Sequence, residues 1–180
     1  MTSTAIATIT TDGAVAGGDT VTFTSVATAN VGTLILQGRA IGSTTVTAQA
    51  AGYADDIATV TVQPSGFILN SGSFTMTAGA ATVSIQVNSA RLDPTTLNFA
   101  ENQQVRGGLT VDVPVTVTDQ TGGPGVGTIT TSPVTFTGPQ NLRTTQFDPA
   151  VAGTSLISVG VPPGFDTPSN NCQITATVNP

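Results

Sequence analysis

The sequence predicts an all-β protein made of two β-sandwiches in series, joined by a short linker. Three observations predict this class. First, Val and Ile alternate with Thr and Ser along most of the chain, which is the period of a half-buried strand. Second, turn pairs such as Asp12-Gly13 and Gly107-Gly108 interrupt these runs at intervals typical of short sandwich strands. Third, the last third of the chain repeats the first third.

The repeat consists of five matched pieces in the same order. They are ATITT at 7–11 and GTITT at 127–131, VTFT at 21–24 and 134–137, Gly42 and Gly153 at the start of alternating segments, Gly52-Tyr53 and Gly164-Phe165, and TVTVQP at 59–64 and TATVNP at 175–180. A repeated unit indicates that one supersecondary arrangement is used twice. Phe23 and Phe136 are therefore expected to be equivalent core residues.

Period-two alternation places the strands in order along the chain. In the first part we expect strands at 5–11, 20–26, 33–37, 44–50 and 57–63. In the second part we expect them at 66–70, 73–77, 81–87, 97–100, 109–118, 127–131, 134–137, 144–147, 154–161 and 172–178. Helical periodicity is absent, apart from a conceivable short turn of helix near 91–95.

The domain boundary is predicted at 63–66, because a strand ends there and Pro64 lacks the N–H that a ladder needs. This gives a first domain at 1–64 and a second at 65–180. The second copy of the repeat is preceded by about 55 residues, at 67–121, that the first copy lacks. The first domain is therefore short or truncated at its N-terminus. It is a compact five-strand variant, a domain cut short, or a subunit completed by strands from a neighbouring chain.

Composition excludes several classes of function. Charged residues form 8% of the chain, lysine and histidine are absent, and the net charge is −6, so a basic surface for nucleic acid is not expected. No apolar run approaches the roughly 20 residues that span a bilayer, so membrane insertion is not expected either. The N-terminus has no signal-peptide pattern. The one cysteine, Cys172, has no internal disulfide partner, and we expect a half-buried residue at a strand start.

Enzyme activity is not expected, because the chain lacks the side chains that usually act as general bases or activate nucleophiles. The remaining route is a pair of carboxylates, but Asp93, Glu101, Asp112 and Asp119 are spread over separate turns and strand edges, where structural roles explain them better. No cofactor is expected. Calcium binding is the more serious alternative to a carboxylate pair, with Asp12, Asp19, Asp55 and Asp56 as candidate ligands, of which the adjacent Asp55 and Asp56 are the main pair; a solvated loop explains them better, since no DxDxDG-like spacing is present.

The few aromatic residues are expected to have structural roles. Phe23, Phe99, Phe136 and Phe147 lie within alternating strand patterns, which favours core packing. Tyr53 and Phe165 follow equivalent glycines and are expected to plug the ends of the two sandwiches. Because tryptophan is absent and Tyr53 is the only tyrosine, a glycan-binding surface is weakly supported.

The segment VGTLILQGRAIGSTTVTAQAAGYADDIATVTVQP, at 31–64, resembles the C-terminal half of bacterial immunoglobulin-like domains of the group 2 type, and residues 153–180 follow the same pattern more loosely. The resemblance covers about a third of the chain. It implies tandem immunoglobulin-like Greek-key β-sandwiches in a surface or secreted bacterial protein.

Three functions are considered, of which the first two follow from the resemblance and the repeat. The expected function is a non-catalytic structural or spacer module, extracellular or at the cell surface, in a fragment that lacks its signal peptide. The first alternative is a fibre or adhesin subunit that self-associates, or binds a protein partner, by β-strand complementation between chains. The second alternative is a calcium- or glycan-binding module.

Overall fold

The computed structural model describes residues 5–24, 30–119 and 124–180, and these residues form strands and loops without a helix. The strands are β1 (Ala7–Thr10), β2 (Ile35–Gly38), β3 (Gly42–Ala48), β4 (Asp56–Val62), β5 (Ser65–Leu69), β6 (Phe74–Thr77), β7 (Val83–Leu92), β8 (Phe99–Asn102), β9 (Thr110–Val113), β10 (Val115–Asp119), β11 (Gly127–Ile129), β12 (Val134–Thr137), β13 (Leu142–Pro149), β14 (Gly153–Val159) and β15 (Gln173–Asn179). The predicted all-β class is confirmed. The described part of the chain holds no long apolar helix of the kind that crosses a membrane.

The chain divides into two compact units. Unit 1 comprises Met1–Gln63 with Arg106–Leu109, and unit 2 comprises Pro64–Val105 with Thr110–Pro180. The predicted domains at 1–64 and 65–180, and their immunoglobulin-like character, stay predictions.

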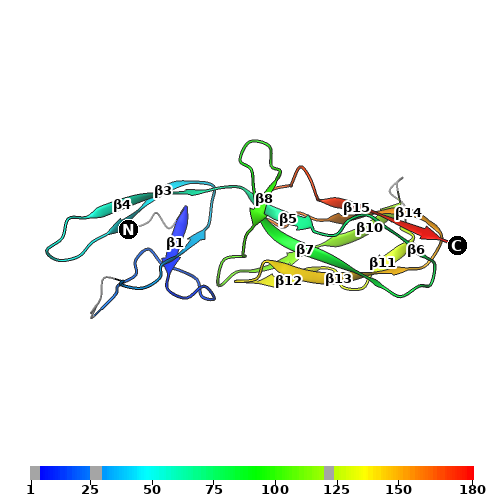
Figure 1. Cartoon of the computed structure of the whole chain (residues 1–180), viewed down its shortest axis with the longest axis horizontal. Coiled ribbons are helices and arrows are strands. Elements are labelled where there is room, and N and C mark those ends of the chain that lie inside the picture. Colours follow the sequence, from blue (N-terminus) through cyan, green and yellow to red (C-terminus); the bar gives the residue numbers. More distant parts are fainter. Residues whose placement is uncertain (1–4, 25–29, 120–123) are drawn as a thin grey trace. The chain divides into compact units, whose positions relative to one another are not determined.

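Unit 2 is a β-sandwich. One sheet has the strand order β10-β14-β15-β6, and the other has the order β11-β13-β7-β5 with β8 added at β7. All of these pairs are antiparallel except β15 with β6, which is parallel. In Figure 1, β7 and β13 run along one layer of unit 2 while β10, β14 and β15 run along the other. A further ladder joins β12 to β9.

The core of unit 2 lies between the two sheets, and phenylalanines fill much of it. The rings of Phe74 and Phe147 come from opposite sheets, with centroids 5.7 Å apart in an edge-to-face arrangement. The Phe67 ring lies 5.0 Å from that of Phe136 and 4.8 Å from that of Phe165. The expected core roles of Phe136 and Phe147 are confirmed, since both are fully buried. Phe165 is half-buried against this core, in accord with its predicted role.

Unit 1 contains two short antiparallel ladders, β1 with β2 and β3 with β4. Its described residues bury only two apolar side chains, Ala7 and Ile9. One face of the β1–β2 ladder is covered by the loop that follows β1. There Gln37 donates from Nε2 to the Val15 carbonyl and accepts from the Gly17 amide, both at 2.8 Å. These bonds satisfy the side chain of Gln37, which is buried.

The sequence repeat extends to the backbone. Gly42 and Gly153 have φ of +148° and +146°, and each begins a strand that pairs with the last strand of its unit, opposite Val62 and Val178 respectively. The Ile6 carbonyl accepts hydrogen bonds from the amides of Arg39 and Ala40, three and two residues before Gly42. The Val126 carbonyl accepts the equivalent bonds from the amides of Ala150 and Val151, three and two residues before Gly153. The ladders β1–β2 and β3–β4 are therefore the counterparts of β11–β13 and β14–β15.

Several details of the sequence analysis are wrong, and three of them concern unit 1. The expected strand at 20–26 is absent over 20–24, and residues 25–26 lie outside the described residues. Phe23 is 36% exposed, so it is not the core equivalent of Phe136. Tyr53 is 80% exposed at a turn and plugs nothing, because no second layer covers that end of the β3–β4 ladder in the described residues of unit 1.

The expected strand at 109–118 is two strands, because Pro114 interrupts it. On either side of the proline, β9 pairs with β12 and β10 pairs with β14. The chain therefore changes sheets at Pro114. The conceivable helical turn near 91–95 is displaced, since β7 continues through Leu92. A single turn follows at 94–96, where the Leu97 amide donates to the Asp93 carbonyl at 2.9 Å.

Candidate functional site

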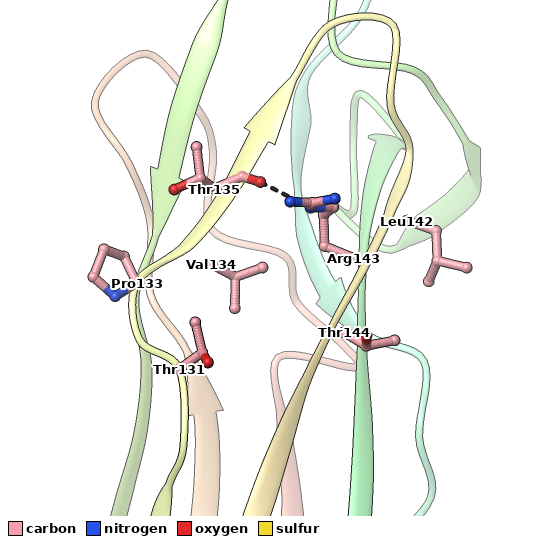
Figure 2. Close-up of a pocket in the computed structure, with 7 residues that line it drawn as sticks. All are labelled: Thr131, Pro133, Val134, Thr135, Leu142, Arg143 and Thr144. Carbon is pink, nitrogen blue, oxygen red and sulfur yellow. Dashed lines mark hydrogen bonds between the residues drawn. The ribbon is translucent and has the colours of Figure 1, made fainter.

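A shallow cleft of about 510 Å³ lies between β12 and β13 in unit 2. It is lined by Thr131, Pro133, Val134, Thr135, Leu142, Arg143 and Thr144. Figure 2 shows the Arg143 side chain reaching from β13 to the backbone of β12, where Nε donates to the Thr135 carbonyl at 2.9 Å. The Thr135 hydroxyl in turn donates to Asp112 Oδ1 at 2.6 Å.

The side chains that line this cleft offer hydroxyl groups and one guanidinium group. Arg143 and the lining threonines are exposed, and the lining contains neither a carboxylate nor a sulfur atom. The Thr135 hydroxyl has Asp112 as its acceptor, and the residues that line the cleft include no histidine or cysteine that would complete a nucleophilic site. The sequence analysis did not anticipate this cleft, because the strand alternation and the repeat at 131–144 indicate strands but no binding site.

The carboxylates considered as a catalytic pair have separate structural roles. Asp93 accepts from the Thr95 and Thr96 amides at 3.0 and 2.7 Å and from the Thr96 hydroxyl at 2.9 Å. These donors, the Thr96 amide first, hold the pKa of Asp93 below its ordinary value. Glu101 pairs with Arg91 Nε at 2.7 Å on an exposed surface, where an ion pair contributes about 0–1 kcal/mol.

The main calcium candidates lie before and at the start of β4. Asp55 Oδ2 accepts from Gln49 Nε2 at 2.7 Å, and Asp56 Oδ1 accepts from the Ile57 amide at 3.0 Å. Both aspartates are exposed. Within residues 5–24, 30–119 and 124–180, no three carboxylate or sulfur side chains gather into a group that could hold a metal. Calcium binding at Asp55 and Asp56 stays a prediction.

Cys172 is a free, half-buried thiol one residue before β15. Its carbonyl accepts a hydrogen bond from the Val159 amide at 3.0 Å, which continues the β14–β15 ladder. The expected placement near a strand start is confirmed.

The most distinctive surface of unit 1 is the outer edge of β3. In unit 2 the equivalent strand β14 pairs with β15 on one side and with β10 on the other. Among the described residues, β3 pairs with β4 alone. β3 contains no charged residue and no proline, the two devices that usually protect an edge strand from pairing with another chain. The sequence signal for this difference is the shorter first copy of the repeat, which lacks the residues that precede the second copy.

The apolar side of unit 1 is also less covered than that of unit 2. Leu36 lies opposite Ile9 on β1–β2, as Phe147 lies opposite Ile129 on β11–β13. Leu36 is 45% exposed, whereas Phe147 is fully buried beneath Phe74 of β6. The described residues of unit 1 contain no counterpart of β6, so this face lacks the second layer that unit 2 has.

No family model and no curated protein matches the sequence. Among solved structures, the crystal structure of domains 4 and 5 of the S-layer protein SbsC aligns with 14% sequence identity and a TM-score of 0.45. That alignment covers 78% of this chain and 66% of the S-layer chain.

Proposed function

We propose that this chain is a non-catalytic structural module of a repetitive bacterial protein, secreted or at the cell surface, and that unit 2 transmits tension along the chain. The carrying observation is the placement of the two terminal strands of unit 2. The chain enters unit 2 along β5 and leaves it along β15, and Figure 1 shows these chain ends at opposite ends of the unit.

Both terminal strands are held by backbone ladders that run along the direction of pull. β5 forms five cross-strand pairs with β7. β15 lies between two strands, with six pairs to β14 and four to β6. Tension applied at the two ends loads the bonds of each ladder together, in shear, because the strands lie along the force. A ladder pulled from one end of the pair instead opens one hydrogen bond at a time.

Composition and site chemistry support the same function. Threonine and serine cover the strands in place of charged residues, and the repeat uses one ladder arrangement twice. The resemblance of 31–64 to bacterial immunoglobulin-like domains is the support for the bacterial surface location. The cleft at Arg143 contributes hydrogen bonds only.

Single-molecule force spectroscopy tests this proposal by changing only the direction of load. In the first geometry the whole chain is stretched between its N-terminus and Pro180, and unfolding of unit 2 should release roughly 400 Å of contour length. In the second geometry the handles are attached at Ala152→Cys, in a Cys172→Ser background, and at Pro180. Ala152 adjoins the Gly153–Val178 pair, so this pull peels β14 from β15.

At the same loading rate, the end-to-end pull should require a clearly higher force than the peeling pull. The folded protein and its hydrogen bonds are the same in both geometries, so a difference in stability cannot produce this result. Equal forces, or an end-to-end pull without a distinct unit 2 event, would show that unit 2 is not built to transmit tension.

A further inference from the structure

We propose that residues 165–171 form a strap that clamps unit 2 against tension, because they tie the first strand of the unit to the chain that leads into the last. The strap lies between β14 and β15 in the chain. Its Asp166 amide donates to the Ser65 carbonyl at 2.7 Å, at the start of β5. The Leu69 amide, at the end of β5, donates to the Asn171 carbonyl at 2.7 Å. The strap's role rests on the tension-bearing function proposed above for unit 2.

The order of these two bonds makes the strap and β5 a parallel pair. Ser65 is bonded to an earlier strap residue than Leu69 is, so the two segments run in the same direction. The chain enters unit 2 at the start of β5 and leaves it at the end of β15, which continues from the strap. Tension therefore pulls the two parallel segments from opposite ends, and their bonds are loaded together in shear.

The strap acts on the force-bearing strand that has the fewer ladder bonds. β5 lies at the end of the strand order β11-β13-β7-β5 and forms its ladder with β7 on one side. β15 has ladders on both sides, with β14 and with β6. Of the two terminal strands, β5 is therefore expected to detach first under tension. Because the strap supplies the second side of β5, it sets the force at which this strand detaches.

The strap also packs on both faces of β5. On the core face, the ring of Phe165 lies 4.8 Å from that of Phe67. Gly66, the neighbouring residue of the strand, faces the opposite side. There the strap comes so close that a Cβ at Gly66 would lie 2.6 Å from the Asp166 carbonyl oxygen and 3.0 Å from Pro168 Cγ. Any side chain at this position would push the strap away from β5.

The segment that follows β7 holds the strap as well. Ser169 donates twice, from its amide to the Leu97 carbonyl at 2.9 Å and from Oγ to the Thr96 carbonyl at 2.6 Å. Asn170 Oδ1 accepts from the Phe99 amide at 2.8 Å. Since β7 is the ladder partner of β5, the strap is bonded both to β5 and to the chain that continues from its partner. These bonds keep the strap in place while β5 is loaded.

Unfolding rates at constant force test the strap, in the two pulling geometries described above and in a Cys172→Ser background throughout. Ser169→Ala/Asn170→Ala removes two of the bonds that hold the strap, and Gly66→Ala pushes the strap from β5. Each should raise the end-to-end unfolding rate at least about tenfold, because fewer bonds then resist detachment of β5. Neither should change the peeling rate, because that pull starts at the Gly153–Val178 pair and reaches the strap last.

Ser155→Ala is the matched control, because it also removes a hydrogen bond of unit 2, the one accepted from the Val126 amide at 2.8 Å. Ser155 lies on β14, outside both the strap and β5. Urea unfolding of every variant gives its loss of stability and shows that it folds. The control should lose stability without a comparable rise in the end-to-end rate. If Gly66→Ala does not fold, the double variant decides alone.

Each outcome decides the strap's role. A rise in the end-to-end rate of the strap variants, with an unchanged peeling rate, supports it. An unchanged end-to-end rate overturns it, and so does a rise that the peeling geometry or Ser155→Ala shares equally. Either of these results leaves the tension-bearing function of unit 2 standing, because that function is judged on the chain without strap substitutions. If that chain resists both pulls equally, the function and the strap's role are overturned together.

Discussion

Replacing Phe136 by Ala should destabilise unit 2 strongly, whereas replacing Phe23 should not. Phe136 is fully buried, with its ring 5.0 Å from that of Phe67. Removing a buried phenylalanine costs about 3–5 kcal/mol, through lost apolar burial and the cavity left behind. Complete burial of a phenylalanine side chain stabilises a fold by about 1.5–3 kcal/mol. Phe23 is 36% exposed, so its truncation loses only part of that free energy. It also opens no enclosed cavity.

The free energy of unfolding should be measured by urea titration followed by far-UV circular dichroism, with calorimetry alongside. The chain has no tryptophan, and its one tyrosine, Tyr53, lies in unit 1, so intrinsic fluorescence does not report on unit 2. For a unit of this size, 3–5 kcal/mol corresponds to a fall in Tm of about 10–20 °C. A loss below about 1.5 kcal/mol for Phe136→Ala, or equal losses for both variants, would refute the packing argument.

Three further variants test the repeat, a buried hydrogen bond and an acid-sensitive turn. Gly153→Ala should cost about 1–3 kcal/mol, because φ is +146° and the new Cβ would lie 2.8 Å from Val126 Cγ1; Gly72→Ala, in open space, is the control, and equal losses would contradict the argument. Ser155→Ala removes the buried hydroxyl that accepts from the Val126 amide at 2.8 Å and should cost about 1–3 kcal/mol, so a neutral result in urea unfolding would show that the amide finds another acceptor. Asp93→Asn should reduce the loss of stability on acidification. The pKa of Asp93 is lower in the folded protein than in the unfolded chain, where it is about 3.9, so the ionised carboxylate stabilises the fold at pH values above about 3.9. This stabilisation is lost as the pH falls through the folded pKa. Unfolding measured across acid pH should therefore be less pH-dependent in the variant, and unchanged pH dependence would rule out this role.

The sequence predicted most strand positions, because alternation at period two is a local property of exposed and half-buried strands. It failed where a proline or a missing layer decides the outcome. Pro114 looks like one position in a continuous alternating run, yet it separates β9 from β10 and sends them to different partners. Phe23 follows the same pattern as Phe136, but burial depends on what packs against a side chain.

The candidate surfaces could be anticipated only in part. The unequal lengths of the two repeats indicated that unit 1 lacks strands that unit 2 possesses. Which strand covers the outer edge of β14, the counterpart of β3, could be learned only from the pairing of β10 with β14. The cleft at Arg143 was not predicted, because it forms where β12 lies beside β13 rather than from any local motif.

The sequence by itself determined that the protein is all-β and that one ladder arrangement is used twice. Strand period and repeated glycines are encoded locally, and Gly42 and Gly153 keep the same backbone angle in both units. The tertiary structure alone decided that Phe147 is buried while the equivalent Leu36 is exposed. The physical reason is that burial is a property of two facing layers: in unit 2 β6 lies over that position, and the described residues of unit 1 contain no counterpart of β6.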